Sequence, residues 1–359
     1  MRPQKVPGDE VLGPYEFSHV IGRPAGTGAG LLFPLDLAID EAEGVLYVVC
    51  RQQPRVSRWT LAGDYVDQFG HPGFVNPEGR LGLVPGELYW PASIALDPAV
   101  GAPGAPPDGT AAVQRALYVA EEAPHRVQKL TTTGQFVAKW GTNGALDRLP
   151  TAGPRAGQFN RPSGVAVDAA SHVYVVDTLN HRVQKFAPTG RFVAQWGTQG
   201  AGPGEFDHPW GIDVDAARGR VYVADWRNDR VQQFDLDGRF VAALGRAGHG
   251  PGELRRPAGV AVDPDGNVAV ADWGNDRVQV LAPDGTALAV LTGHGDQFSR
   301  VAKVFMDARD DLVKLRTEAG GGHPLEPYFW APIGVTFDAA GTLYAADTLR
   351  HRVQVYRRR

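Results

Sequence analysis

The sequence has almost no cysteine, no marked excess of charge of one sign and no long apolar run. Cys50 is the single cysteine among 359 residues, so no internal disulfide can form, which fits a reducing compartment. A net charge of −4 gives no overall attraction for nucleic acid or anionic lipid, and neither is expected as a partner. No apolar run is long enough to span a bilayer, and the first residues lack the apolar core of a signal peptide. These features predict a cytoplasmic protein.

Glycine, proline and one repeated motif are abundant instead. The 45 glycines and 28 prolines indicate many turns. The segment DTLNHRVQKF at 177–186 returns as DTLRHRVQVY at 347–356. Six related copies lie at 46–59, 117–130, 173–186, 221–234, 268–281 and 343–356. A recurrence of this kind is typical of repeat folds in which each unit is one supersecondary structure.

Each copy has the pattern of several short strands. A proline-led strand such as RPSGVAVD at 161–168 precedes the motif, and in the first five units a strand such as TGRFVAQWG at 189–197 follows it. Alternating β-branched and aromatic residues between turns favour antiparallel hairpins, here four strands per unit. One such sheet has two apolar faces that only neighbouring sheets can cover. The sequence therefore predicts an all-β fold, a six-bladed β-propeller.

The two ends of the chain and one insertion complete the expected organisation. The last unit stops at VQVYRRR without a fourth strand, and the N-terminal strand from residue 14 is expected to complete it. The chain would then consist of an extension at 1–13, one propeller at 14–356 and a basic tail at 357–359. Within an insertion at 293–328, apolar residues at 299–316 fall on one helical stripe. They predict an amphipathic helix, either a partial lid over the channel mouth or a docking helix for another subunit.

The units resemble NHL repeats, and DTLNHRVQKF matches the Asp-x-x-Asn-His-Arg core of that family especially well. The resemblance extends over nearly the whole chain and implies the fold more strongly than the function, because such propellers include protein-binding modules, RNA-binding modules and a zinc-dependent lyase. In the amidating lyases that these units resemble, three histidines directly after the strand-leading prolines hold zinc. Here none of those positions is histidine, so zinc of the lyase type is not expected, and any other cofactor remains unknown. The positions are Leu35, Ala92, Ser163, Trp210, Ala258 and Ile333.

An acidic residue and an arginine recur five positions apart in blades two to six, as in Asp177 and Arg182. A hairpin loop brings such residues together, which predicts a structural ion pair worth about 0.2 to 1 kcal/mol. His181 precedes the arginine, but units four and five have Asp229 and Asp276 at that place. The motif therefore does not require histidine chemistry, and the simplest role of His181 is to pack its loop.

Function is expected where the repeat departs from symmetry. In blade one, Cys50 replaces the acid opposite Arg55, and Asp36 replaces a small residue. An arginine beside a thiol favours a lowered pKa and hence a nucleophile or metal ligand; the alternative is an inert buried cysteine. Asp213 stands where sister blades have alanine, so it is a candidate acid or base, or a satisfied buried carboxylate.

Tryptophans are expected around the mouth of the central channel, where they can stack on aromatic, sugar or cationic groups or pack between blades. The candidate catalytic residues are Cys50, Asp36 and Asp213. The candidate ligand-binding residues are Trp210, Trp226, Trp273, His181, Ser163 and Arg55. The sequence thus favours a propeller that binds a small molecule or peptide at the mouth, or an interaction scaffold with a protein partner. The alternative is a lyase or hydrolase that acts on a small substrate at the same mouth.

Overall fold

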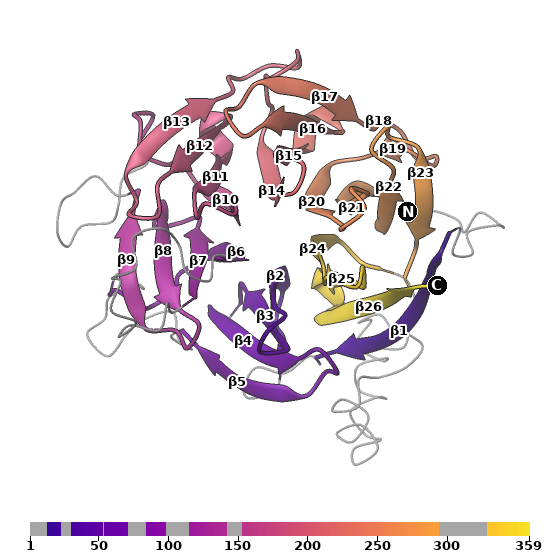
Figure 1. The fold of residues 1–359 in the computed structure, drawn as a ribbon, viewed down its shortest axis with the longest axis horizontal. Helices are drawn as coiled ribbons and strands as arrows, with labels where there is room; N and C mark the ends of the chain where they lie inside the picture. The colour runs from indigo at the N-terminus through magenta and orange to yellow at the C-terminus, as the bar shows by residue number, and fades with distance from the viewer. Residues whose placement is uncertain are drawn as a thin grey trace, which may run out of the picture.

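Six four-stranded antiparallel sheets stand around a central axis as the blades of a propeller (Figure 1). The computed structural model describes residues 13–22, 30–52, 54–70, 84–97, 115–141, 153–293 and 329–359. The predicted six-bladed all-β architecture is confirmed. In every blade the proline-led strand is innermost, and in blades 1 to 5 the four strands follow one another outward, so one repeat builds one sheet.

The first three blades follow one another along the chain. Blade 1 consists of β2 (Pro34–Asp40), β3 (Val45–Cys50), β4 (Arg55–Thr60) and β5 (Tyr65–Phe69). Blade 2 consists of β6 (Pro91–Leu96), β7 (Ala116–Glu121), β8 (Arg126–Thr131) and β9 (Phe136–Trp140). Blade 3 consists of β10 (Pro162–Val167), β11 (Val173–Asp177), β12 (Arg182–Phe186) and β13 (Phe192–Trp196).

The other three blades complete the ring. Blade 4 consists of β14 (Pro209–Asp215), β15 (Arg220–Asp225), β16 (Arg230–Asp235) and β17 (Phe240–Leu244). A short parallel pair follows, β18 (Arg246–Ala247) and β19 (Glu253–Leu254). Blade 5 consists of β20 (Pro257–Val262), β21 (Val268–Asp272), β22 (Arg277–Leu281) and β23 (Ala287–Leu291). Blade 6 consists of β24 (Pro332–Phe337), β25 (Leu343–Asp347), β26 (Arg352–Arg358) and β1 (Tyr15–Ile21).

Blade 6 takes its outermost strand from the other end of the chain. β1 pairs with β26 from Tyr15 opposite Arg358 to Ile21 opposite Val353, and the two strands run side by side at the rim (Figure 1). The prediction of a separate tail at 357–359 is wrong in part, because β1 gives Arg357 and Arg358 backbone partners and β26 extends through them.

The helix predicted at 299–316 lies outside the described residues. In the described part of the chain, the helices are single 3₁₀ turns between the second and third strands of blades 3 to 6. These turns are η1 (Thr178–Asn180), η2 (Trp226–Asn228), η3 (Trp273–Asn275) and η4 (Thr348–Arg350). No helix within the described ranges has the length and apolar character needed to cross a membrane.

The core is divided among the junctions between blades. Buried apolar side chains of the described residues form six clusters, each drawn from two adjacent blades. Between blades 6 and 1, for example, Trp59 and Leu46 pack with Val353 and Val355. Each sheet therefore buries both faces, which explains why the second strand of a blade is almost continuously apolar.

The innermost strands approach each other so closely that most carry glycine at the second residue after the proline. A Cβ on Gly259 would lie 2.0 Å from the carbonyl oxygen of Ile333, and one on Gly334 would lie 2.5 Å from that of Leu35. Such distances exclude a side chain unless the strands move apart. Blades 1 and 2 are the exceptions, with Asp36 and Ser93 at this place.

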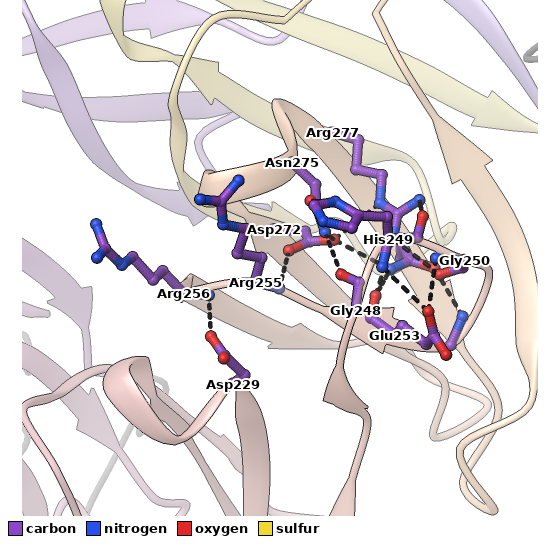
Figure 2. A network of polar contacts seen from close by, with 12 residues as sticks. Asp229, Gly248, His249, Gly250, Glu253, Arg255, Arg256, Asp272, Asn275 and Arg277 are labelled. Atoms are coloured by element: carbon purple, nitrogen blue, oxygen red, sulfur yellow. Dashed lines mark hydrogen bonds and ion pairs between the residues drawn. The ribbon is translucent and has the colours of Figure 1, made fainter. Parts of the chain in front are cut away.

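The repeated acid organises a buried network in each of blades 2 to 6, shown for blade 5 in Figure 2. Asp272 accepts hydrogen bonds from Arg277 Nε at 2.8 Å, Asn275 Nδ2 at 2.9 Å and the backbone N–H of Arg255 at 2.7 Å. Arg277 in turn donates to the carbonyl oxygens of residues 249, 250 and 253. The predicted ion pair is confirmed, and it also fixes the loop that enters the blade.

In blades 2 to 6, the side chain directly before the repeated arginine accepts a backbone hydrogen bond from the next blade, a contact that we call the latch. His181 Nδ1 accepts the backbone N–H of His208 at 3.2 Å, and Asp229 Oδ1 accepts that of Arg256 at 2.7 Å (Figure 2). His125, Asp276 and His351 make the same contact with the residue that precedes the next strand-leading proline. Either histidine or aspartate can stand at this place, because both side chains can accept the backbone hydrogen bond at a similar distance. The histidine of the repeat is therefore explained as a structural residue.

The latch gives a first testable prediction. Asp276→Ala removes the acceptor for the N–H of Ala331, now 2.7 Å away, and leaves that donor without its partner. We expect the free energy of unfolding in urea to fall by about 1 to 3 kcal/mol. Asp276→His, which installs the residue of the sister loops, should recover most of this loss. Equal stability of the alanine variant and the wild type would contradict the latch.

Candidate functional site

The six innermost strands enclose a narrow channel on the ring axis. Its lining includes Asp36, Ser93, Ser163 and Trp210. The free space is about 30 Å³ for the centre of a water-sized sphere, room for about two water molecules. The channel therefore admits the end of one side chain or a small polar group, and anything larger must rest on the face around its mouth.

Asp36, from β2, is a carboxylate held inside this channel. Its Oδ2 accepts a hydrogen bond from Ser93 Oγ at 2.6 Å and from the backbone N–H of Ile94 at 3.1 Å. Burial raises the pKa of Asp36 from 3.8 to about 6, and these hydrogen bonds only partly offset the effect. The two residues that break the glycine rule of the inner strands are thus bonded to each other.

Asp213, from the innermost strand β14 of blade 4, is a second carboxylate whose charge reaches Asp36, although it does not itself line the free space of the channel. It accepts the backbone N–H of Val214 and that of Val262, each at 2.8 Å. Burial raises the pKa of Asp213 to about 6 as well, and its charge contributes to the raised pKa of Asp36. Among the residues that the structure describes, no cationic side chain forms an ion pair with Asp36 or Asp213. The two carboxyl groups therefore become negatively charged only as the pH approaches neutrality.

Three tryptophans form a row on the mouth face of blades 4 and 5. The ring centroids of Trp210 and Trp226 lie 6.0 Å apart, as do those of Trp226 and Trp273. The guanidinium of Arg256 lies 5.0 Å from the Trp226 ring. All three indoles are partly exposed, so their faces form an aromatic surface beside the channel.

Ser163 and Arg55 occupy less open positions. Ser163 Oγ lies 2.6 Å from Thr178 Oγ1 and donates to the carbonyl of Trp210 at 2.9 Å, so it fixes the start of the tryptophan row. Arg55 is buried and donates to the backbone carbonyl of Gly30. Arg55 therefore lies where its sister arginines lie, inside the blade network.

Cys50 does not join the channel carboxylates. It ends β3 opposite Arg55 and is fully buried in the cluster between blades 6 and 1. Burial raises the pKa of its thiol, although Arg55 and a backbone hydrogen bond act in the other direction. The prediction of a lowered pKa is therefore wrong, because loss of water outweighs the nearby arginine.

His181 belongs to a polar cluster that sequence reasoning missed in part. Asp207 Oδ1 lies 2.6 Å from His208 Nδ1 and 3.8 Å from His181 Nδ1. His208 and Asp207 directly precede the strand-leading Pro209, where the sister blades have no histidine. Alignment of the six units on their prolines would have exposed this difference.

Comparison with known proteins agrees with the fold. Residues 159–237 match a family described as "6-bladed beta-propeller", and residues 254–281 match the NHL repeat. Together with the observed ring of six sheets, these matches show a six-bladed β-propeller in which at least one unit is similar to the NHL repeat.

Individual relatives match parts of the chain. "Protein brain tumor" of Drosophila melanogaster is 46% identical over 57 residues, which is 16% of this chain and 6% of the relative. Peptidyl-glycine alpha-amidating monooxygenase of Mus musculus is 34% identical over 98 residues, 26% of this chain and 10% of the relative. The matched segment is thus at most a tenth of the length of these two proteins.

Among solved structures, a gluconolactonase from Xanthomonas campestris superposes with a TM-score of 0.57 at 14% identity and covers 98% of both chains. At this identity the likeness shows the fold alone. The site must therefore be interpreted from its own residues.

Proposed function

We propose that this propeller binds a small molecule or peptide at the channel mouth and selects one that presents a cationic group. The observation that carries the proposal is a pair of carboxylates on the innermost strands, Asp36 and Asp213, which accept hydrogen bonds but form no ion pair with any described residue. A bound ammonium or guanidinium would supply the missing positive charge.

The surroundings of the two carboxylates fit such a ligand. A small cationic head matches the free space of about 30 Å³, whereas the rest of the ligand would rest on the tryptophan row. Indole faces attract cations and also cover apolar chains. A scaffold role would use the same face, with a lysine or arginine of the protein partner as the inserted group.

The test compares n-butylguanidinium with n-butylurea, its neutral counterpart of similar shape, by thermal unfolding at pH 8. A ligand at ten times its Kd adds about 1.4 kcal/mol to stability, a rise in Tm of about 1 to 3 °C for a chain of this size. We expect the rise for the cation and none for the urea. The rise should shrink at pH 5, where both carboxylates are mostly protonated.

Variants of the carboxylates sharpen this test. Asp36→Asn and Asp213→Asn should each abolish most of the stabilisation by n-butylguanidinium. Asp237→Asn is the matched control, because it removes the same charge from an exposed turn. Equal effects of the cation and the urea, or full retention in both channel variants, would contradict the proposal.

A second candidate function is cleavage of a small substrate at the same mouth, by a lyase or a hydrolase reaction. The observation that favours it is the pKa of about 6 of Asp36 and Asp213, close to the value at which a carboxyl can both give and accept a proton. Cys50 has no part in this scheme because it is buried away from the channel lining. Turnover of lactone or ester substrates that is lost in Asp213→Asn and retained in Asp237→Asn would support it.

A further inference from the structure

A second group of polar side chains lies on the mouth face between blades 3 and 4. His181, Asp207 and His208 form this cluster, and one ligand-type atom from each lies within 4.8 Å of the other two. All three side chains are partly exposed, at 13%, 30% and 22% respectively, so an ion can reach them from solvent. We refer to them as the His–Asp–His cluster.

His181 forms the latch that its sister positions share, whereas Asp207 and His208 are departures from the repeat. Before the strand-leading proline, the other blades have Phe33, Trp90, Arg161, Arg256 and Ala331. In those blades the latch uses the backbone N–H of that residue, which any side chain allows. The ring of His208 is therefore additional to the latch.

The donor geometry is close to that of a metal site. Asp207 Oδ1 lies 2.6 Å from His208 Nδ1 and 3.8 Å from His181 Nδ1, and the two rings are nearly perpendicular at 87°. Ligand atoms bonded to a tetrahedral zinc at about 2.0 to 2.2 Å lie roughly 3.3 to 3.6 Å from one another. The two separations from Asp207 lie on either side of that range, and the two histidine ligand atoms lie within 4.8 Å of each other, so shifts of about 1 Å in the side chains would complete the geometry.

Hydrogen bonds prepare His181 for this role. Its Nδ1 accepts the N–H of His208 at 3.2 Å, so the lone pair is on Nδ1 and the ring proton on Nε2. The backbone carbonyl of Phe206 acts on the same ring and favours its protonated form. Such a carbonyl contact is the usual support of a metal-binding histidine, because it fixes the tautomer. An ion would replace the His208 N–H at Nδ1.

We propose that the His–Asp–His cluster binds one divalent transition ion of the zinc class. Two imidazoles and one carboxylate are a donor set that such ions prefer, and three protein ligands leave a further position open to solvent at the mouth. The ligands differ in place from the lyase histidines, which would follow the proline. This inference is independent of the cation proposal, because neither Asp36 nor Asp213 takes part.

The test uses tag-free protein stripped with chelator and titrated with Zn²⁺ by calorimetry and with Co²⁺ by visible absorption. We expect one ion per chain and the intense absorption of four- or five-coordinate Co²⁺. His208→Gln and Asp207→Asn should each weaken Zn²⁺ binding at least ten-fold. Both variants keep the backbone N–H groups of residues 207 and 208, which bond to Asp225 and His181.

His172→Gln is the matched control, because His172 Nδ1 lies 3.1 Å from Asp168 Oδ2 and forms a histidine–aspartate pair without a second imidazole. It should bind Zn²⁺ as the wild type does. Unchanged thermal unfolding of the metal-free variants would show that the fold is intact. Failure to bind a stoichiometric ion, or equal binding by His208→Gln and the wild type, would overturn the proposal.

Discussion

Asp177→Ala is expected to lower the free energy of unfolding by about 3 to 5 kcal/mol, the usual cost of leaving one member of a buried ion pair alone. Asp177 is fully buried and accepts Arg182 Nε at 2.7 Å, Asn180 Nδ2 at 2.8 Å and the backbone N–H of Asn160 at 2.6 Å. Its removal leaves the buried guanidinium of Arg182 without a counter-charge. Urea denaturation would measure the loss.

An exposed ion pair provides the control for this prediction. Arg246 lies 3.1 Å from Glu253, but its side chain is 81% exposed. Arg246→Ala should therefore cost less than about 1 kcal/mol. If Asp177→Ala also lowered the free energy of unfolding by less than about 1 kcal/mol, the buried network would contribute no more than a surface ion pair, and the prediction would be wrong.

Stability is expected to fall between about pH 4 and pH 6 because of the two innermost-strand carboxylates, Asp36 and Asp213. Burial raises the pKa of Asp36 and of Asp213 from 3.8 to about 6, so the folded state holds these protons more tightly than the unfolded state. Their stabilising contribution is complete below about pH 4 and is lost as the pH rises through 6. A two-unit shift corresponds to about 3 kcal/mol, and partial access to the channel reduces this to about 1 to 3 kcal/mol for each group.

Asparagine variants identify the source of this pH dependence. Asp36→Asn and Asp213→Asn remove the titration, so each should flatten the curve of unfolding free energy against pH and stabilise the protein at pH 8. Asp237→Asn, in an exposed turn, should leave the curve unchanged. Denaturant unfolding at several pH values would measure these curves. If the free energy of unfolding depended on pH in all three variants as it does in the wild type, the assignment would be contradicted.

The fold was predictable because each blade is specified locally. In blades 1 to 5 the Pro-led strand, the hairpin loops and the outer strand lie within about 35 to 50 consecutive residues, so strand order follows from turns that the sequence displays. The sequence did not reveal how deeply the ion pair is buried. Its value depends on burial by neighbouring loops, such as the carbonyls of residues 154 and 155 that bond to Arg182, and these come from outside the motif.

From the sequence, the site was predictable only as a set of positions at which one blade departs from the residue that its sister blades share. Asp36 and Asp213 were singled out because they break the repeat, and both lie in the channel or against it. Their partners were not foreseen: Ser93 is 57 residues from Asp36, and Val262 is 49 residues from Asp213. Such contacts depend on the packing of one blade against the next. Cys50 was misjudged for the same reason, because its pKa depends on a core that blades 6 and 1 build together.

The most direct test of the account is the number of protons exchanged when n-butylguanidinium binds at pH 6, measured by calorimetry in buffers of different ionisation enthalpy. A cation placed between Asp36 and Asp213 lowers their pKa, so binding should release protons, and the release should disappear in the Asp36→Asn, Asp213→Asn double variant. Binding without proton release, or with the same release in the double variant, would place the ligand elsewhere and contradict the assignment of the channel mouth.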